Sequence, residues 1–129
     1  MRNLLPIFVM TGCVVIPTYA ADSVEAHKGW MDTSQQLRDD LQEALNGKTG
    51  AKAAAPAQKL TAILQKEVKY WTDNKQADAL KLAQDNVAQI TAIAAAAKAN
   101  KMDDAKKSFA QLSETCDACH NLHPEKRLK

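Results

Sequence analysis

The chain has 129 residues, of which 46% are hydrophobic and 25% are charged, and this length suits a single domain. Aromatic residues make up only 5% of it, and glycine and proline contribute four residues each. Helices are therefore favoured over an all-β fold or a turn-rich α/β sheet. The 17 basic and 15 acidic side chains give a net charge of +2 without a basic stripe or an acidic tail, which argues against a nucleic-acid partner.

The N-terminal segment has the pattern of a secretory signal peptide. Arg2 precedes an apolar run from Leu4 to Ile16, and the small residue Ala20 ends the segment before a polar stretch. The run is too short to cross a bilayer as a helix, so no membrane span is expected. These features predict a signal peptide at residues 1–20, export to the periplasm, and one mature domain over residues 21–129.

Two alternatives for this segment stay open. Met10-Thr11-Gly12-Cys13 also fits a lipoprotein processing site, at which the thiol of Cys13 would be acylated and would tether the protein to a membrane face. The segment could instead form a buried or anchoring helix. In the lipoprotein alternative, as with a cleaved signal peptide, the mature protein leaves the cytoplasm.

Beyond this segment, apolar residues recur at steps of three and four, which predicts helices. The first helix is expected over residues 22–46, with Asp22 and Glu25 as a capping box and Gly47 at its end. A second helix is expected to begin at Pro56, because proline is favoured at the first helical position.

Turn residues separate two further helices. Asp73-Asn74 precedes the third helix, and Asn100-Lys101 precedes the fourth. Four helices with short connections imply an all-α, antiparallel, up-down-up-down four-helix bundle, in which the last helix ends beside the N-terminal half of the first. The residues expected to face inward are, helix by helix, Val24, His27, Met31, Ser34, Leu37, Leu41 and Ala44; Leu60, Ile63, Leu64, Val68 and Trp71; Leu80, Ala83, Val87, Ile90, Ala94 and Ala97; and Met102, Ala105, Phe109, Leu112, Cys116 and Cys119.

The sequence Cys116-Asp117-Ala118-Cys119-His120 is C-x-x-C-H, the attachment motif of c-type haem. On a helix, thiols three residues apart face the same way and can form thioethers with two vinyl groups at one porphyrin edge, while the adjacent histidine ligates the iron. The motif predicts one covalent haem c, and export agrees with it because such haem is attached outside the cytoplasm. A thioredoxin-like redox pair would expect a βαβ context and a zinc site a second cysteine pair, and the sequence offers neither.

The position of this motif, near the C-terminus of a four-helix chain, resembles the class II cytochromes c: the cytochrome c prime family and its low-spin, methionine-ligated relatives. The resemblance covers the whole mature chain and implies that Cys116, Cys119 and His120 bind the haem. In that family the residue on the open side of the iron lies at a fixed distance before the glycine that ends the first helix. Counted from Gly47, that residue is Met31. Methionine there implies a six-coordinate iron with His120 and Met31 as its axial ligands.

His27, one turn before Met31 on the same helical face, is the main rival for the sixth position. The family usually has a basic residue there, near a haem propionate, and the resemblance implies this role for His27. The chain departs from the family after the motif, where His123 and Pro124 stand in place of an aromatic residue and an arginine. The last helix is therefore expected to end before Pro124, with His123 as a solvated side chain.

These features predict a periplasmic monohaem electron carrier for redox partner proteins, in which His120 and Met31 hold the iron in both redox states. The alternatives are a five-coordinate, cytochrome c prime-like protein that binds nitric oxide or carbon monoxide, and a bundle without haem. The sequence offers no Ser/His/Asp set, no paired carboxylates in an evident cleft and no phosphate loop, so no enzyme activity is predicted. A homodimer through an exposed helix face is compatible with the resemblance.

Overall fold

The computed structural model describes residues 23–47 and 49–124. The predicted signal peptide at residues 1–20, including the alternative lipid-anchoring Cys13, lies outside the described residues. Over the described ranges the chain is helical and has no strand. The elements are α1 (Val24–Asn46), a 3-10 helix η1 (Gly50–Ala53), α2 (Ala54–Asp73), α3 (Ala77–Lys98) and α4 (Met102–Leu122).

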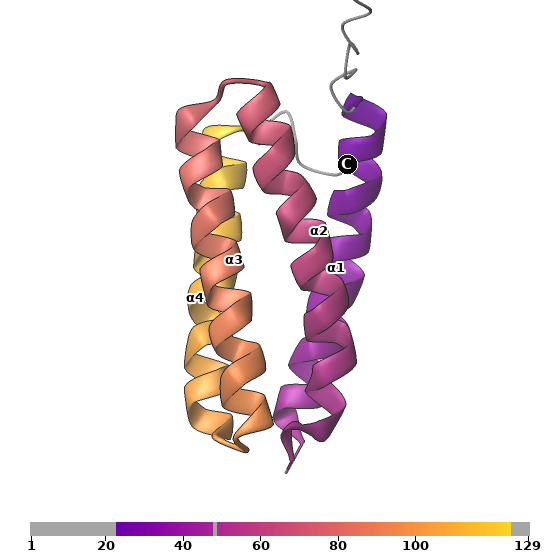
Figure 1. Cartoon of the computed structure of the whole chain (residues 1–129), viewed down its shortest axis with the longest axis vertical. Helices are drawn as coiled ribbons and strands as arrows, with labels where there is room; N and C mark the ends of the chain where they lie inside the picture. The colour runs from indigo at the N-terminus through magenta and orange to yellow at the C-terminus, as the bar shows by residue number, and fades with distance from the viewer. Residues whose placement is uncertain (1–22, 48, 125–129) are drawn as a thin grey trace, which may run out of the picture.

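The four long helices lie side by side along one axis, each running opposite to the next (Figure 1). The helix α3 packs extensively against both α2 and α4, and α1 packs mainly against α2, whereas α1 and α4 share few contacts. The prediction of an all-α chain with four mutually packed helices is therefore confirmed. None of the described helices is long and apolar enough to span a membrane.

The first helix is capped one residue later than predicted. It begins at Val24, and the Oγ of Ser23 accepts a hydrogen bond from the backbone N–H of Ala26 at 3.1 Å. Ser23 thereby satisfies one of the N–H groups that a helix start leaves unpaired. The prediction that Asp22 caps the helix is wrong, and Asp22 itself lies outside the described residues.

The other helix ends follow the local signals closely. The helix α2 begins at Ala54, so Pro56 lies in its first turn instead of starting it. Asn100 has a φ of 57°, a left-handed conformation that asparagine tolerates, and it separates α3 from α4 as predicted. The helix α4 ends at Leu122, two residues before Pro124, which confirms the expected early end.

The core is aliphatic along most of the bundle and becomes aromatic near the end where α2 meets α3. Tyr70 and Trp71 form a second cluster there with Ala79 and Ala83. The large side chains with the least exposure are Leu41, Leu45, Leu60, Ile90, Ile93, Leu112 and His27. His27 is the one polar residue among them, and it lies beside the pocket described below.

The buried face of α3 differs in part from the predicted stripe. The predicted residues Leu80, Val87 and Ala94 are only half-buried, and the buried stripe instead contains Ala79, Ala83, Asn86, Ile90, Ile93 and Ala97. The prediction followed apolar residues alone and therefore passed over Asn86. Because α3 packs between two neighbours, both stripes still contact protein.

Gly50 lies against the backbone of α3, which gives a test of the fold. A Cβ at this position would lie 1.9 Å from the carbonyl oxygen of Ala97, and backbone cannot move aside as a flexible side chain can. We predict that Gly50→Ala lowers the free energy of unfolding by about 3 kcal/mol. Gly29→Ala is the matched control, because its Cβ would meet nothing within 4 Å.

Alanine at position 29 is expected to stabilise α1 by about 1 kcal/mol, since glycine is the poorer helix former. Urea denaturation of the two variants measures both changes. Equal stabilities for Gly50→Ala and Gly29→Ala would contradict the close approach of η1 to α3.

Candidate functional site

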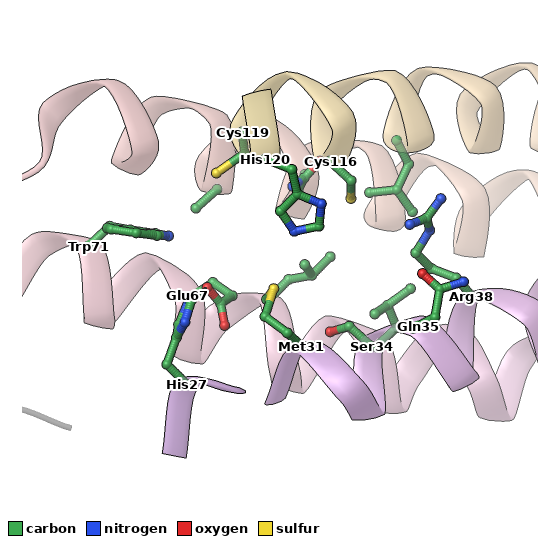
Figure 2. Close-up of a pocket in the computed structure, with 15 residues that line it drawn as sticks. His27, Met31, Ser34, Gln35, Arg38, Glu67, Trp71, Cys116, Cys119 and His120 are labelled. Carbon is green, nitrogen blue, oxygen red and sulfur yellow. Dashed lines mark hydrogen bonds and ion pairs between the residues drawn. The ribbon is translucent and has the colours of Figure 1, made fainter. Parts of the chain in front are cut away.

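An internal pocket of about 60 Å³ lies toward the end of the bundle where α1 begins and α4 ends, and Figure 2 shows its walls. All four helices contribute to it. The residues that line it are His27, Met31, Ser34, Gln35, Arg38, Leu60, Leu64, Glu67, Trp71, Ala83, Asn86, Leu112, Cys116, Cys119 and His120. The five residues predicted from the sequence to bind a cofactor are all in this set. The structure therefore brings together residues of the first and last helices that lie far apart in the chain, because in this bundle both helices line one pocket.

The C-x-x-C-H motif forms part of the α4 wall. Cys116 and Cys119 are one helical turn apart, and both are partly buried, so they line the pocket instead of filling the core. Neither cysteine is part of a disulfide among the described residues. Figure 2 shows the imidazole of His120 between the two sulfur atoms, directed into the pocket. The motif thus presents two thiols and an imidazole to one space.

Met31 belongs to the opposite wall, which α1 provides. Its side chain is partly buried, and in Figure 2 its sulfur faces the imidazole of His120 across the pocket. The expected position of the N-terminal half of α1 opposite the C-terminal end of α4 is thereby confirmed. A thioether and an imidazole on facing walls are a donor pair that can ligate one iron from two sides.

His27 lies in a buried polar contact. Its Nε2 is 2.7 Å from the Oε2 of Glu67 in α2, and the two side chains are 1% and 5% exposed. The imidazole also stacks on Tyr70, with ring centroids 4.1 Å apart and an angle of 19° between the planes. The sequence predicted His27 as a rival iron ligand or a propionate contact, and the structure gives it a carboxylate partner.

Five buried side-chain atoms without a hydrogen-bond partner in the described part of the chain all belong to residues that line this pocket. They are His27 Nδ1, Ser34 Oγ, Arg38 Nε, Glu67 Oε1 and Asn86 Oδ1. A buried polar atom without a partner costs about 1–3 kcal/mol, so native structures contain few of them. Their collection around one space indicates that the pocket is built for a bound group or for ordered water.

Arg38 adds a positive charge to the pocket. Its Nη2 donates a hydrogen bond to the Oγ of Ser113 at 3.1 Å, which joins α1 to α4. Among the described residues Arg38 takes part in no ion pair. A guanidinium in this situation can accommodate an anion such as a carboxylate.

His123 is packed against the aromatic cluster, and the prediction that it is a solvated side chain is wrong. Its side chain is 13% exposed, and its Nε2 lies 3.3 Å from the Oδ2 of Asp78 in α3. Its ring centroid is 5.1 Å from that of Trp71, a residue of the pocket wall. A hydrogen bond from the backbone of Ala79, with a smaller contribution from His123, lowers the pKa of Asp78. The residue after α4 therefore packs against a residue of the pocket wall.

Sequence reasoning missed Glu67, Arg38 and Asn86. A signal for all three was present. Glu67 continues the steps of Leu60 and Leu64, and Asn86 lies three positions after Ala83. Polar residues on an inward stripe are unusual and point to a buried polar site. Arg38 likewise continues the steps of Met31 and Ser34 on α1.

Comparisons of the chain with protein-family models, curated proteins and solved structures gave no significant match. The geometry of the pocket is therefore the structural basis for a functional proposal. In the described part of the chain, no three His, Cys, Asp or Glu side chains are grouped so that they could hold a bare metal ion.

The side chains that line the pocket fit a covalently attached haem, but the volume of the pocket does not. Two thiols and an adjacent imidazole are the groups that attachment of a c-type haem requires, the thioether of Met31 is a possible second iron ligand, and unpartnered polar atoms surround them. A cavity of about 60 Å³ holds only a few water molecules and is far smaller than a porphyrin. The described conformation would have to open to admit such a group.

Burial raises the pKa of the Cys116 thiol, because a thiolate is poorly solvated in this position. The charge of Arg38 and a hydrogen bond from Asn86 act in the opposite direction, but their effect is smaller. We predict that in the haem-free Cys119→Ser variant the reaction of Cys116 with iodoacetamide has a higher pH midpoint than in the same chain unfolded in urea.

The rate of alkylation, followed by mass spectrometry across a pH series, measures this midpoint. The folded state holds the thiol proton more tightly, so the haem-free protein should also lose stability as the pH rises through the folded pKa. The Cys116→Ser variant, which removes the titrating group, is the control for that loss. Identical midpoints in the folded and unfolded chains would contradict the burial of Cys116.

Proposed function

We propose that this chain is an exported monohaem c-type cytochrome that transfers electrons. Cys116 and Cys119 would hold a haem through two thioethers, and His120 and Met31 would supply the iron ligands. The observation that carries the proposal is the position of the C-x-x-C-H motif and Met31 on facing walls of one internal pocket. The resemblance of the sequence to class II cytochromes c supports the same assignment.

The chain supplies the attachment chemistry through two thiols on one face of a helix. Each thiol would add its S–H across one vinyl group, with the sulfur bonded to carbon and the hydrogen transferred to the neighbouring carbon. Cys116 and Cys119 are three residues apart in a continuous helix, so both reach the same edge of one planar group. Haem supplies a one-electron couple between ferric and ferrous iron when it is bound.

The two residues that would ligate the iron come from two different helices, which are long and regular. His120 belongs to α4 and Met31 to α1, and both side chains are directed into the pocket. A neutral imidazole and a neutral thioether suit both oxidation states, so electron transfer needs little movement of the protein. Methionine as the second ligand raises the reduction potential relative to ligation by two histidines.

Arg38 is the residue best suited to the carboxylate groups of a porphyrin. Its guanidinium carries the positive charge on the α1 wall, and its Nε has no partner in the described part of the chain. A hydrogen bond between a guanidinium and a carboxylate is stronger than one between neutral groups. Arg38 would thus orient one side of the prosthetic group while the two cysteines fix the other.

Space for a haem would come from separation of α1 and α4. These helices share few contacts, whereas α3 is packed firmly against α2 and α4. Opening the bundle at this seam would break the fewest contacts and would widen the gap between Met31 and His120. The α3–α4 pair can stay intact in the process.

The setting of the activity follows from the sequence. The signal-peptide pattern at residues 1–20 supports export, and residues 21–129 would then act in the periplasm with soluble or membrane-bound redox proteins as partners. An electron carrier catalyses no reaction on a substrate, so the proposal requires no catalytic acid, base or nucleophile.

The visible spectrum of the purified, exported protein tests the proposal. We predict that haem stays attached after acid–acetone extraction and that the oxidised protein is low-spin, with a thioether-to-iron band in the red. Met31→Ala is expected to remove this band and convert the iron to the high-spin form. Met102→Ala is the matched control, because Met102 begins α4 and is not among the residues that line the pocket.

A protein without covalent haem would contradict the proposal as a whole. A high-spin wild-type protein whose spectrum is unchanged by Met31→Ala and that binds carbon monoxide rapidly would contradict electron transfer. It would favour gas binding as the function. A double Cys116→Ser, Cys119→Ser variant should lose covalent attachment in either case.

A further inference from the structure

The pocket contains two donors on one face of α1 that could ligate the same iron. His27 and Met31 are one helical turn apart, and both line the pocket. Imidazole is a common iron ligand in haem proteins, and so is the thioether of methionine. A chain that carries haem with one defined ligand set must therefore restrain one of the two side chains.

His27 is restrained on several sides. Its Nε2 lies 2.7 Å from the Oε2 of Glu67, where an imidazole N–H donates to a carboxylate oxygen, and both side chains are almost completely buried. Tyr70 stacks on the ring at 4.1 Å. Trp71 and Trp30 meet it edge to face, with centroids 5.3 Å and 6.4 Å away.

Met31 is directed differently. Figure 2 shows its sulfur facing the imidazole of His120, while the imidazole of His27 lies beside Glu67, nearer the start of α1. For His27 to leave this position it would have to give up a buried hydrogen bond and an aromatic stack. Glu67 would be left as a buried carboxylate without its partner, which is strongly unfavourable.

We infer that Glu67 is a positioning residue that holds His27 away from the haem iron and so reserves the sixth coordination position for Met31. The inference rests on the proposed function, since it concerns which side chain of this chain reaches the iron. It assigns a role to Glu67, which does not itself touch the metal. It also explains why a carboxylate lies on the inward face of α2.

The first test replaces the carboxylate in the haem-loaded protein. Glu67→Leu is expected to free His27, to abolish the thioether-to-iron band and to lower the reduction potential, because two histidines then ligate the iron. The double variant His27→Leu, Glu67→Leu should regain the band. Glu67→Gln, whose amide oxygen can still accept from the imidazole, should keep it, and Glu114→Leu is the control for the same substitution at an exposed position of α4.

The second test does not depend on whether Glu67→Leu folds, which far-ultraviolet circular dichroism will show. In Met31→Ala, His27 should stay with Glu67, so the iron should become high-spin and bind carbon monoxide. In His27→Leu the competing imidazole is absent, so a thioether band should be present. Low-spin, bis-histidine spectra in Met31→Ala alone, or a thioether band that first appears in His27→Leu, would overturn the inference.

The two proposals fail in different ways. A wild-type protein without covalent haem would overturn both of them. A wild-type protein that has the thioether band, together with a folded Glu67→Leu variant of identical spectrum and potential, would leave the proposed function standing and overturn the role of Glu67.

Discussion

The contact between His27 and Glu67 joins the buried faces of α1 and α2 near the pocket. Because α1 and α4 share few contacts, the N-terminal half of α1 is held mainly by α2. A hydrogen bond of 2.7 Å is directional, and the stacking of His27 on Tyr70 adds a second constraint on its orientation. Together they hold the His27 ring beside α2, while Met31, one turn later on the same helix, is directed into the pocket.

The position of the pocket follows from what surrounds it. Aliphatic side chains such as Leu41 and Ile90 close the bundle on one side, and the cluster of Tyr70 and Trp71 closes it on the other. Between them the inward stripes of three helices carry polar residues, which cannot pack as tightly as leucine or isoleucine. The pocket in the bundle core therefore lies where the cysteines, His120 and Met31 are.

Local signals in the sequence were sufficient to predict the helices and to recognise the C-x-x-C-H motif, because periodicity, turn residues and proline act over a few positions. Glu67 and Asn86 were missed because a count of apolar residues excludes them, and the partner of Glu67 lies forty positions away in the chain. The cap at Ser23 shows the limit of boundary prediction, since two adjacent residues could both serve. The contact of His123 with Trp71 is tertiary and has no signature in the sequence around it.

The small volume of the pocket has a consequence for the order of biogenesis under the proposed function. A chain that closes α1 over α4 before haem arrives leaves a cavity of about 60 Å³ around its two cysteines, so a folded chain would be a poor substrate for attachment. The α3–α4 hairpin, in contrast, carries the complete motif and is packed without help from α1. Haem would thus be delivered to an intermediate in which this hairpin has formed and the first helix is still undocked. Under the proposed function, covalent attachment would therefore have to precede the docking of α1.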